Sequence, residues 1–450
     1  MQSLLYYYLR EPPSPFPDLL VLASCPQPVA ASAIRTGGAG WFSKAMAAAA
    51  ATHSLILVVV VVLVLLHHTP VPVAPPPPPP AGPTTVVSID GTSWQINGRP
   101  THAGSRAEGL LPNARMIQGV FDDANAGTRA NWAYPDTTAW DPARNTREFV
   151  GNMSAWKDAG LLAFTVGLQG GSPHCYGNAG WTVSAFDART GALDPAWAAR
   201  LLLILREADR LGMVVIVQFF YSFQYMKLSE AAQTVAVAQI AGFLLSTGLL
   251  NFVIDAFNER CDAEDAARIT EIHRLAAAHD PPRKLLVASS CPGGQHTPAP
   301  EVVAVSDFVL IHGNGEQPAG ISQLVGKVRA MESWRARPMP IVFNEDDHGN
   351  LLTPSPMGSN LEAAIAANTS WGFLCCCDGK VQGDYSTGYQ CPPVDWRIAG
   401  GGLCLSGPQG RPMVNGSKAD WGVALRRITA PLAHKSPDAR PEVPTVDALS

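Results

Sequence analysis

The segment "NFVIDAFNER", residues 251–260, decides the fold, because an apolar strand runs directly into the polar pair Asn258 and Glu259. A second segment, "PIVFNEDDHG" at 340–349, follows the same plan and reaches Glu345. Strands that are apolar almost throughout are typical of parallel sheets, in which both faces are covered. The two segments therefore predict buried parallel strands that each end in a glutamate.

The same alternation of a short apolar strand and a longer helical stretch continues along most of the chain. Helices are clearest at 194–212, where Pro195 suits a first turn and Gly212 a C-terminal stop, and at 229–248 and 263–280. Eight such units indicate an α/β fold, a (β/α)8 TIM barrel, with an open doubly wound sheet as the alternative. The eight expected strands are 115–121, 161–168, 213–220, 251–257, 284–290, 307–313, 340–345 and 370–376.

Two further stretches set the limits of the folded domain, which we expect at 86–434. Residues 86–101 alternate around the turn dipeptides Asp90-Gly91 and Asn97-Gly98, which predicts a small β-hairpin before the barrel. A long loop rich in Gly, Cys and Pro precedes a last helix, and residues 435–450 are a polar, flexible tail.

An apolar run lies near the N-terminus, "SLILVVVVVLVLL" at 54–66, and the alanine-rich stretch from Ala45 lengthens it toward the roughly 20 residues that cross a bilayer. Basic residues precede it, and the next is Arg99, so the positive-inside tendency places the C-terminal domain outside the cytosol. A cleaved signal and an uncleaved anchor both stay open, because prolines follow the run directly. The expected segments are an N-terminal extension at 1–45, a signal peptide or signal anchor at 46–68 and a Pro-rich linker at 69–85.

Composition excludes some classes of protein. With 450 residues, 47% hydrophobic and 15% charged, the chain can bury a large core. A net charge of −5 without a basic run gives no attraction to nucleic acid, so no nucleic-acid partner is expected. We expect a monomer that meets a membrane only through its N-terminal apolar segment.

Cysteines and glycosylation motifs indicate the secretory pathway. Eight cysteines follow the apolar run, an even number compatible with disulfides in an oxidising compartment, although their pairing stays open. Asn152, Asn368 and Asn415 begin Asn-X-Ser motifs that become glycan acceptors if the domain lies outside the cytosol. The expected location is extracellular, either secreted or anchored by a single span.

Candidate catalytic residues lie at strand ends. In a barrel the functional groups gather at the carboxyl ends of the strands, and Glu259 and Glu345 end the fourth and seventh expected strands. Strand alternation puts Phe343 on the face of Glu345 and Asp255 on the face of Glu259. Both carboxylates are therefore expected to point toward the barrel axis.

These residues resemble the cellulase-like, family 5-like members of clan A of the glycoside hydrolases. That clan carries an Asn-Glu pair at the end of strand four and a second Glu at the end of strand seven, matched here by Asn258-Glu259 and Glu345. The resemblance implies that Glu259 is the acid/base, Glu345 the nucleophile and Asn258 a ligand of the sugar 2-hydroxyl. Arg260 stands where the clan commonly has proline, and 346–348 are not its usual sequence.

Further residues are expected to bind the substrate. His312 ends the sixth strand, where the resemblance places a His or Tyr beside the nucleophile, and a structural histidine is the alternative. Trp371 opens the eighth strand, and core packing is its alternative. The substrate-binding candidates are Asn258, His312, Gln218, Tyr221, Trp371 and Trp181.

The resemblance implies a retaining glycoside hydrolase that acts on a β-linked polysaccharide or oligosaccharide. No cofactor and no metal are expected. A non-catalytic carbohydrate-binding protein on the same fold is the first alternative, since fold does not imply function. A metal-dependent barrel hydrolase is the second, but the first expected strand lacks an HxH ligand pair, and Asp346 to His348 suit helix capping better than ion binding.

Overall fold

The computed structural model describes the larger part of the expected catalytic domain. The described residues are 85–130, 133–134, 136–170, 183–221, 227–346, 359–373 and 418–432. The expected extension, signal or anchor, tail and nearly all of the linker lie outside them. The helices and strands are β1 (Val87–Asp90), β2 (Ser93–Ile96), β3 (Arg99–Pro100), β4 (Asn113–Arg115), the 3-10 helix η2 (Ile117–Val120), α2 (Ala126–Arg129), α3 (Pro142–Asp158), β5 (Ala163–Gly167), α5 (Pro195–Leu211), β6 (Val214–Tyr221), α7 (Glu230–Ser246), β7 (Phe252–Asn258), α8 (Asp265–Ala277), β8 (Val287–Ala288), β9 (Ser290–Cys291), α9 (Pro300–Val305), β10 (Val309–His312), α10 (Pro318–Ala330), α11 (Glu332–Ala336), β11 (Ile341–Glu345), α12 (Asn360–Ala366), β12 (Gly372–Phe373) and α13 (Lys418–Thr429).

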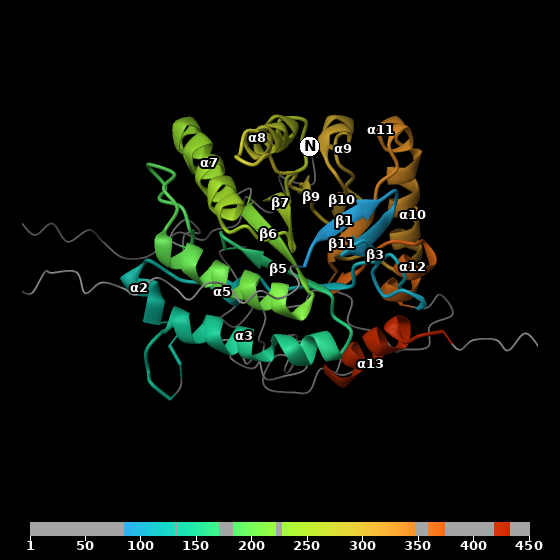
Figure 1. Cartoon of the computed structure of the whole chain (residues 1–450), viewed down its shortest axis with the longest axis horizontal. Helices are drawn as coiled ribbons and strands as arrows, with labels where there is room; N and C mark the ends of the chain where they lie inside the picture. Colours follow the sequence, from blue (N-terminus) through green and yellow to red (C-terminus); the bar gives the residue numbers. More distant parts are fainter. Residues whose placement is uncertain are drawn as a thin grey trace, which may run out of the picture. The chain divides into compact units, whose positions relative to one another are not determined.

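The parallel strands form a closed circuit. One sheet has the order β12-β4-β5-β6-β7-β8 and a second the order β11-β10-β9, and only Ser289 separates β8 from β9 along the chain. A parallel bridge between Val342 and Ser370 joins β11 to the segment that enters β12. The helices surround these strands (Figure 1), as expected for an α/β barrel.

Capping residues mark the ends of α5 and α7 in the sequence. Asp194 caps α5 by accepting a hydrogen bond from the amide of Ala196, and Pro195 opens the helix. Gly212 ends it in the left-handed conformation, with φ of 69°. Ser229 caps α7 in the same way, through the amide of Ala232. Both helices begin and end as the sequence predicts.

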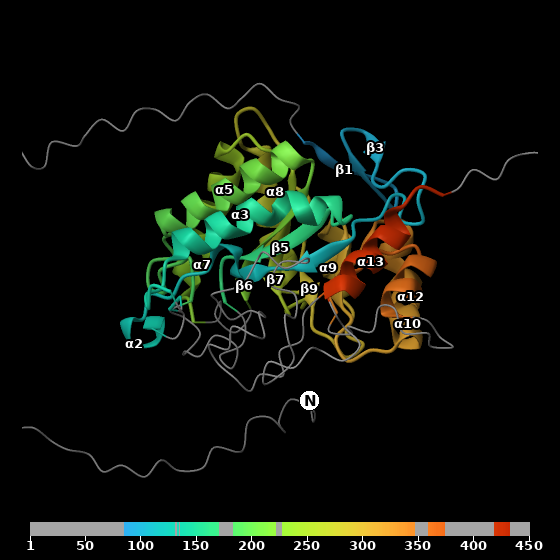
Figure 2. The ribbon, with the colours of Figure 1, turned by 90° about the horizontal axis from the view of Figure 1, so that it is seen from below.

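The N-terminal hairpin closes one end of the barrel. It is a three-stranded antiparallel sheet with turns at the two predicted dipeptides, and Figure 2 shows it beside one end of the parallel strands. The amide of Val87 donates to the carbonyl of Leu250, just before β7. Trp94 is fully buried and meets Phe308 edge to face, with 5.2 Å between ring centroids. The indole thereby covers the inner core of the barrel.

Three predicted strands differ from the observed ones. The apolar run at 115–121 continues the strand only to Arg115 and then turns into η2, because Ile117 and Phe121 pack with Tyr134 and Trp140 in a separate cluster. The run at 284–290 becomes extended only at β8, and β12 covers only two residues of 370–376, of which 374–376 lie outside the described residues. Apolar runs of this length do not by themselves distinguish strand from other buried structure.

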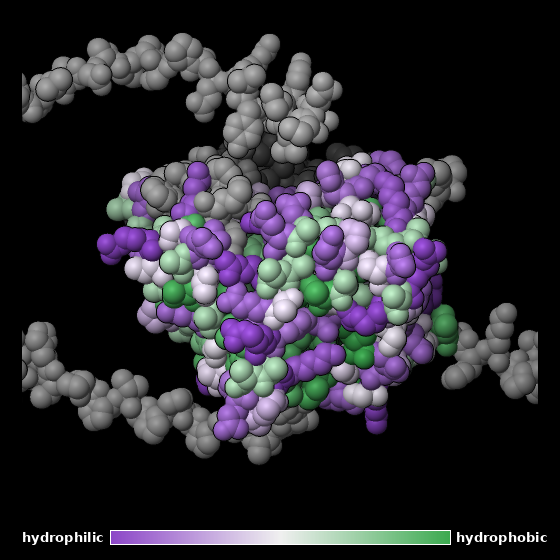
Figure 3. Space-filling view, turned by 90° about the horizontal axis from the view of Figure 1, so that it is seen from above, coloured by the Kyte–Doolittle hydropathy of each residue, from purple (hydrophilic) through white to green (hydrophobic). Residues whose placement is uncertain are grey.

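The surface formed by the outer helices is mixed. Figure 3 shows hydrophilic and hydrophobic residues interspersed over one face of the molecule. Among the described residues, large hydrophobic side chains are exposed only singly, at Val86, Leu203, Val235 and Leu432. Within the ranges given above, no helix combines the length and the apolar character needed to span a bilayer.

Candidate active site

Glu259 follows β7 directly and has an unusual backbone. Its φ is 57°, in the left-handed region that residues other than glycine seldom adopt. The side chain is 32% exposed, and its Oε2 accepts a hydrogen bond of 3.0 Å from the hydroxyl of Tyr221 at the end of β6. Burial, and then the charge of the neighbouring Glu259, raises the pKa of Tyr221, so the phenol stays protonated and its O–H donates a hydrogen bond to the carboxylate.

Glu345 is the last residue of β11 and is held more tightly. Its side chain is 8% exposed, and the guanidinium of Arg115 places Nε 2.9 Å from Oε2. The side-chain amide of Asn314 donates to Oε1 at 3.0 Å. The two oxygens therefore have different partners, which fixes the plane of the carboxylate.

Glu345 reaches the barrel axis by a route that strand alternation does not predict. The pairing of β10 with β11 shifts between Ile311, opposite Phe343, and His312, opposite Glu345. Phe343 packs in the large hydrophobic cluster that includes residues of the helices, whereas Glu345 faces Arg115 and His312. The expected shared face of Phe343 and Glu345 is thus wrong, because a bulge adds a residue between them and turns the glutamate inward.

His312 brings the two carboxylates into one site. It is fully buried, with Nδ1 3.8 Å from Oε1 of Glu259 and Nε2 3.7 Å from Oε2 of Glu345. One ligand atom from each of the three side chains lies within 4.8 Å of the others. Burial lowers the pKa of His312 to about 3, against the opposing effect of Glu259. The imidazole is therefore neutral at neutral pH and separates the two acids without adding charge.

These three side chains have the donor types of a metal site, but their surroundings fit it poorly. The guanidinium of Arg115 already lies against Oε2 of Glu345, the oxygen that faces His312. A divalent cation at that position would meet a fixed positive charge at short distance. The geometry therefore favours a carboxylate held by arginine over a carboxylate that binds a metal.

Asp255 lies one layer deeper in the barrel. It is fully buried and accepts hydrogen bonds from the amide and the hydroxyl of Ser290, at 3.0 and 2.9 Å, and from the side chain of Asn344 at 3.4 Å. Burial raises the pKa of Asp255 to about 7, although the bond from Ser290 and the charge of Arg115 lower it. The side chain thus carries a proton in mildly acidic solution.

We expect Asp255→Asn to remove a fall in stability between about pH 4 and pH 7. The pKa of Asp255 is raised on folding from 3.8 to about 7, so its contribution is complete below the unfolded pKa and is lost as pH rises through the folded one. The slope is at most about 1.4 kcal/mol per pH unit. Chemical unfolding at several pH values checks this; parallel curves for wild type and variant would contradict it.

The remaining predicted residues lie in different surroundings. Asn258 and Gln218 are buried inside the strand ends, and the hydroxyl of Ser290 lies 3.5 Å from Oδ1 of Asn258. Trp371 is 1% exposed, and its indole N–H donates to Asp346 at 2.8 Å. Trp181 lies outside the described residues, as do Asp347 and His348. The substrate-binding roles of these side chains stay predictions.

Sequence reasoning missed Arg115 and Asn314, which both hold the carboxylate of Glu345. Arg115 offered one signal, a charged residue at the head of an apolar run that would enter a barrel interior. Asn314 offered none, because it lies in the loop after His312 and only the fold brings it to Glu345.

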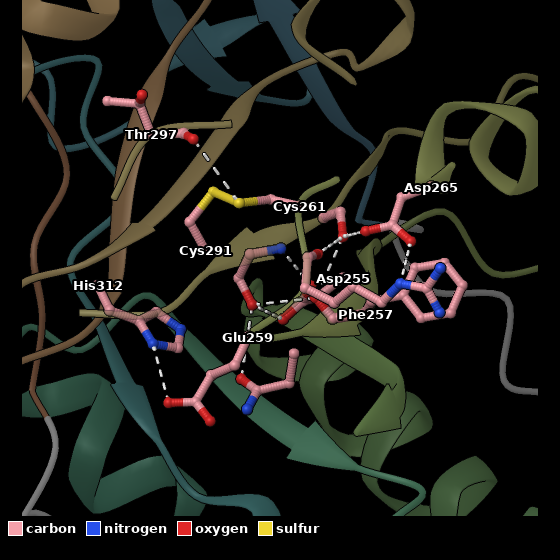
Figure 4. The surroundings of a disulfide bond; sticks show 12 residues. Asp255, Phe257, Glu259, Cys261, Asp265, Cys291, Thr297 and His312 are labelled. Atoms are coloured by element: carbon pink, nitrogen blue, oxygen red, sulfur yellow. Dashed lines mark hydrogen bonds and ion pairs between the residues drawn. A yellow bond between two sulfur atoms is a disulfide. The ribbon is translucent and has the colours of Figure 1, made fainter. Parts of the chain in front are cut away.

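The two cysteines among the described residues form a disulfide. Cys261 lies two positions after Glu259, and Cys291 ends β9. The other cysteines that follow the apolar run lie outside the described residues, including Cys375 to Cys377. The bond therefore joins the end of the fourth barrel strand to the end of the fifth, beside the candidate site (Figure 4).

Comparison with known proteins gives similarity in fold to solved glycosidases. No family model and no curated protein matches the chain. An endo-1,4-beta-mannanase from Rhizomucor miehei has 12% identity and a TM-score of 0.41 over 64% of this chain and 89% of its own. An exo-beta-1,4-mannosidase from an Opitutaceae bacterium has 15% and 0.42 over 76% and 62%. A broad-specificity endoglucanase from Clostridium longisporum has 11% and 0.42 over 74% and 98%.

The geometry around Glu259 and Glu345, with His312 between them, defines the candidate site.

Proposed function

We propose that the protein is a retaining glycoside hydrolase with Glu259 as acid/base and Glu345 as nucleophile. The observation that carries the proposal is the approach of the two carboxylates: one oxygen of each lies within 4.8 Å of the other, beside His312. Retaining enzymes hold their carboxyl groups about 5 to 5.5 Å apart, whereas inverting enzymes need about 6.5 to 9.5 Å to admit a water molecule. The short separation supports attack by an enzyme carboxylate.

The reaction takes two steps. In the first, an oxygen of Glu345 bonds to the anomeric carbon while the bond to the leaving oxygen breaks, and Glu259 gives that oxygen its proton. In the second, Glu259 takes a proton from water, the water oxygen bonds to the anomeric carbon and Glu345 leaves. Each residue returns to its starting state, so no cofactor enters the balance.

The partners of the two glutamates support this division of roles. Arg115 compensates the charge of Glu345 and, with Asn314, leaves the carboxylate little freedom to rotate. Glu259 is more exposed, and among the described residues its carboxylate accepts a hydrogen bond from Tyr221; this suits a group that gains and loses a proton in each cycle. A buried, fixed carboxylate such as Glu345 suits the nucleophile, and the more accessible Glu259 suits the residue that carries the proton.

Substrate and location belong to the same proposal. The resemblance to clan A implies a β-linked polysaccharide or oligosaccharide, bound by Asn258, His312, Gln218, Tyr221, Trp371 and Trp181. The disulfide of Cys261 with Cys291 and the apolar run at 54–66 support a place in the secretory pathway, outside the cytosol.

Hydrolysis by the full chain, produced in an oxidising compartment, tests the proposal. A panel of aryl β-glycosides and β-glucans should include substrates that are cleaved, and NMR of the first product should show the β-anomer. An α-anomer would exclude Glu345 as nucleophile. Binding of a glycan without any cleavage would instead identify a carbohydrate-binding protein.

Tyr221→Phe should lower kcat by about tenfold or less, since one hydrogen bond contributes about 0.5–1.5 kcal/mol. The ring stays in place, but the 3.0 Å bond to Glu259 is lost and the carboxylate gains rotational freedom. Steady-state kinetics across pH measures the effect. An unchanged kcat together with an unchanged pH profile would show that Tyr221 does not orient Glu259.

A further inference from the structure

One short segment, Ser289–Cys291, holds the chain on both sides of Glu259. Before the glutamate, the hydroxyl oxygens of Ser289 and Ser290 both lie 3.2 Å from the carbonyl oxygen of Phe257. After it, the hydroxyl of Ser289 donates to the carbonyl of Arg260 at 2.5 Å, and Cys291 is bonded to Cys261. Figure 4 shows the disulfide of Cys261 with Cys291, with Glu259 and His312 beside it.

The backbone of Glu259 needs such support. A left-handed conformation of a residue with a side chain is unfavourable and persists only where the surroundings enforce it. Arg260 adds to the enforcement, because its Nε lies 2.9 Å from the buried Asp265 at the start of α8. With its φ of 57°, Glu259 is thus a strained residue between two anchored parts of the chain, Phe257 before it and 260–261 after it.

We propose that Ser289–Cys291, with the disulfide to Cys261, is a clamp that positions Glu259 for proton transfer. Opening the disulfide would free the chain after Glu259, let its backbone relax and move the carboxyl away from the leaving oxygen. Glu345 would not move, since β11, Arg115 and Asn314 hold it independently. The inference rests on the proposed function and assigns Cys261, Cys291 and Ser289 as positioning residues.

If the disulfide only stabilised the fold, its loss would have a different effect on the reaction rates. If the bond served only to keep the barrel folded, its loss would lower the amount of active protein and reduce turnover of every substrate by the same factor. A clamp on the acid reduces only reactions whose leaving group needs a proton. The dependence of the rate on the leaving group therefore separates the two roles.

The experiment compares kcat/KM for two aryl β-glycosides of the same sugar, one with 2,4-dinitrophenol and one with phenol as leaving group. The full chain is tested as wild type, Cys261→Ser with Cys291→Ser, and Ser289→Ala. Ser306→Ala is the matched control. The buried hydroxyl of Ser306 also donates to a backbone carbonyl, that of Val302 at 2.7 Å, but it does not contact the candidate site. Wild type is also assayed in a phosphine reductant, and the double variant shows whether any effect of reductant comes from other cysteines.

We expect the double variant to lose about tenfold on the phenyl glycoside and less than about twofold on the dinitrophenyl glycoside. Reduced wild type should behave like the double variant, and the double variant should not respond to the reductant. Ser289→Ala should show the same selectivity with a smaller loss, which keeps the test valid if the double variant does not fold. Equal losses on both substrates would overturn the clamp.

Amide hydrogen exchange keeps this test separate from that of the proposed function. Exchange at 257–261 should rise in the folded double variant and stay unchanged in Ser306→Ala. If wild type cleaves neither glycoside, the proposed function fails, and exchange alone decides whether the segment is clamped. Unchanged exchange at 257–261 would overturn the clamp whatever the activity.

Discussion

Glu345→Ala should lower kcat by a factor on the order of 10⁴ to 10⁶, because loss of a nucleophile removes the path through the covalent intermediate. The loss should be equal for good and poor leaving groups, since neither can form the intermediate. Azide should enter the space left by the carboxylate and attack the anomeric carbon from the same side. Detection of an α-glycosyl azide would identify Glu345 as the nucleophile.

Folding must be checked beside this loss, because Glu345 is half of a buried ion pair. Breaking such a pair by removing one partner costs about 3–5 kcal/mol, and Arg115 would lose its contact with Oε2. Glu345→Gln keeps the shape and one oxygen and is the matched control for stability. Activity of either folded variant close to that of wild type would exclude Glu345 from the reaction.

The two glutamates could be predicted from the sequence because each ends a strand that is buried along its length. β7 and β11 are apolar segments with one clear end, so a polar residue at that end has one plausible location in a barrel. The strand count then assigned both glutamates to the same rim of the barrel. The hydrophobic pattern of the two strands was therefore sufficient to predict at which end of the barrel the glutamates lie.

The direction of Glu345 could not be predicted in the same way. Alternation has a period of two, so a single extra residue reverses every side chain beyond it, and the shift between Ile311 and His312 is a property of the pairing of β10 with β11. Nothing in either strand's own sequence marks it. The role of Arg115 could not be predicted for a related reason, since its partner Glu345 lies far along the chain.

The contacts of Glu259 were equally hidden. Its left-handed backbone follows from hydrogen bonds and a disulfide made by residues about 30 positions later. Cysteine counting left the pairing open, and Arg260 appeared only as a departure from the clan pattern. In the fold Arg260 has a clear partner in Asp265. Long-range contacts, rather than local propensity, thus define the acid side of the site.

Glu259→Ala should lower kcat/KM for the phenyl glycoside by a factor of about 10² to 10⁴, the usual contribution of a general acid. The dinitrophenyl glycoside needs no proton for its departure, so its kcat/KM should change little. Its kcat should still fall, because no base then activates water, and the sugar should accumulate on Glu345. Mass spectrometry of the intact protein during turnover measures this adduct.

Azide separates the two glutamates by stereochemistry. In Glu259→Ala it should attack the covalent intermediate and give a β-glycosyl azide, with kcat for the dinitrophenyl glycoside restored. Glu259→Gln is the matched control, because it keeps the size of the side chain and a possible partner for Tyr221. An α-azide from Glu259→Ala and a β-azide from Glu345→Ala would require the two roles to be exchanged. Equal loss on both leaving groups in Glu259→Ala would show that Glu259 gives no proton in the first step, since an acid contributes only where the departing oxygen needs one.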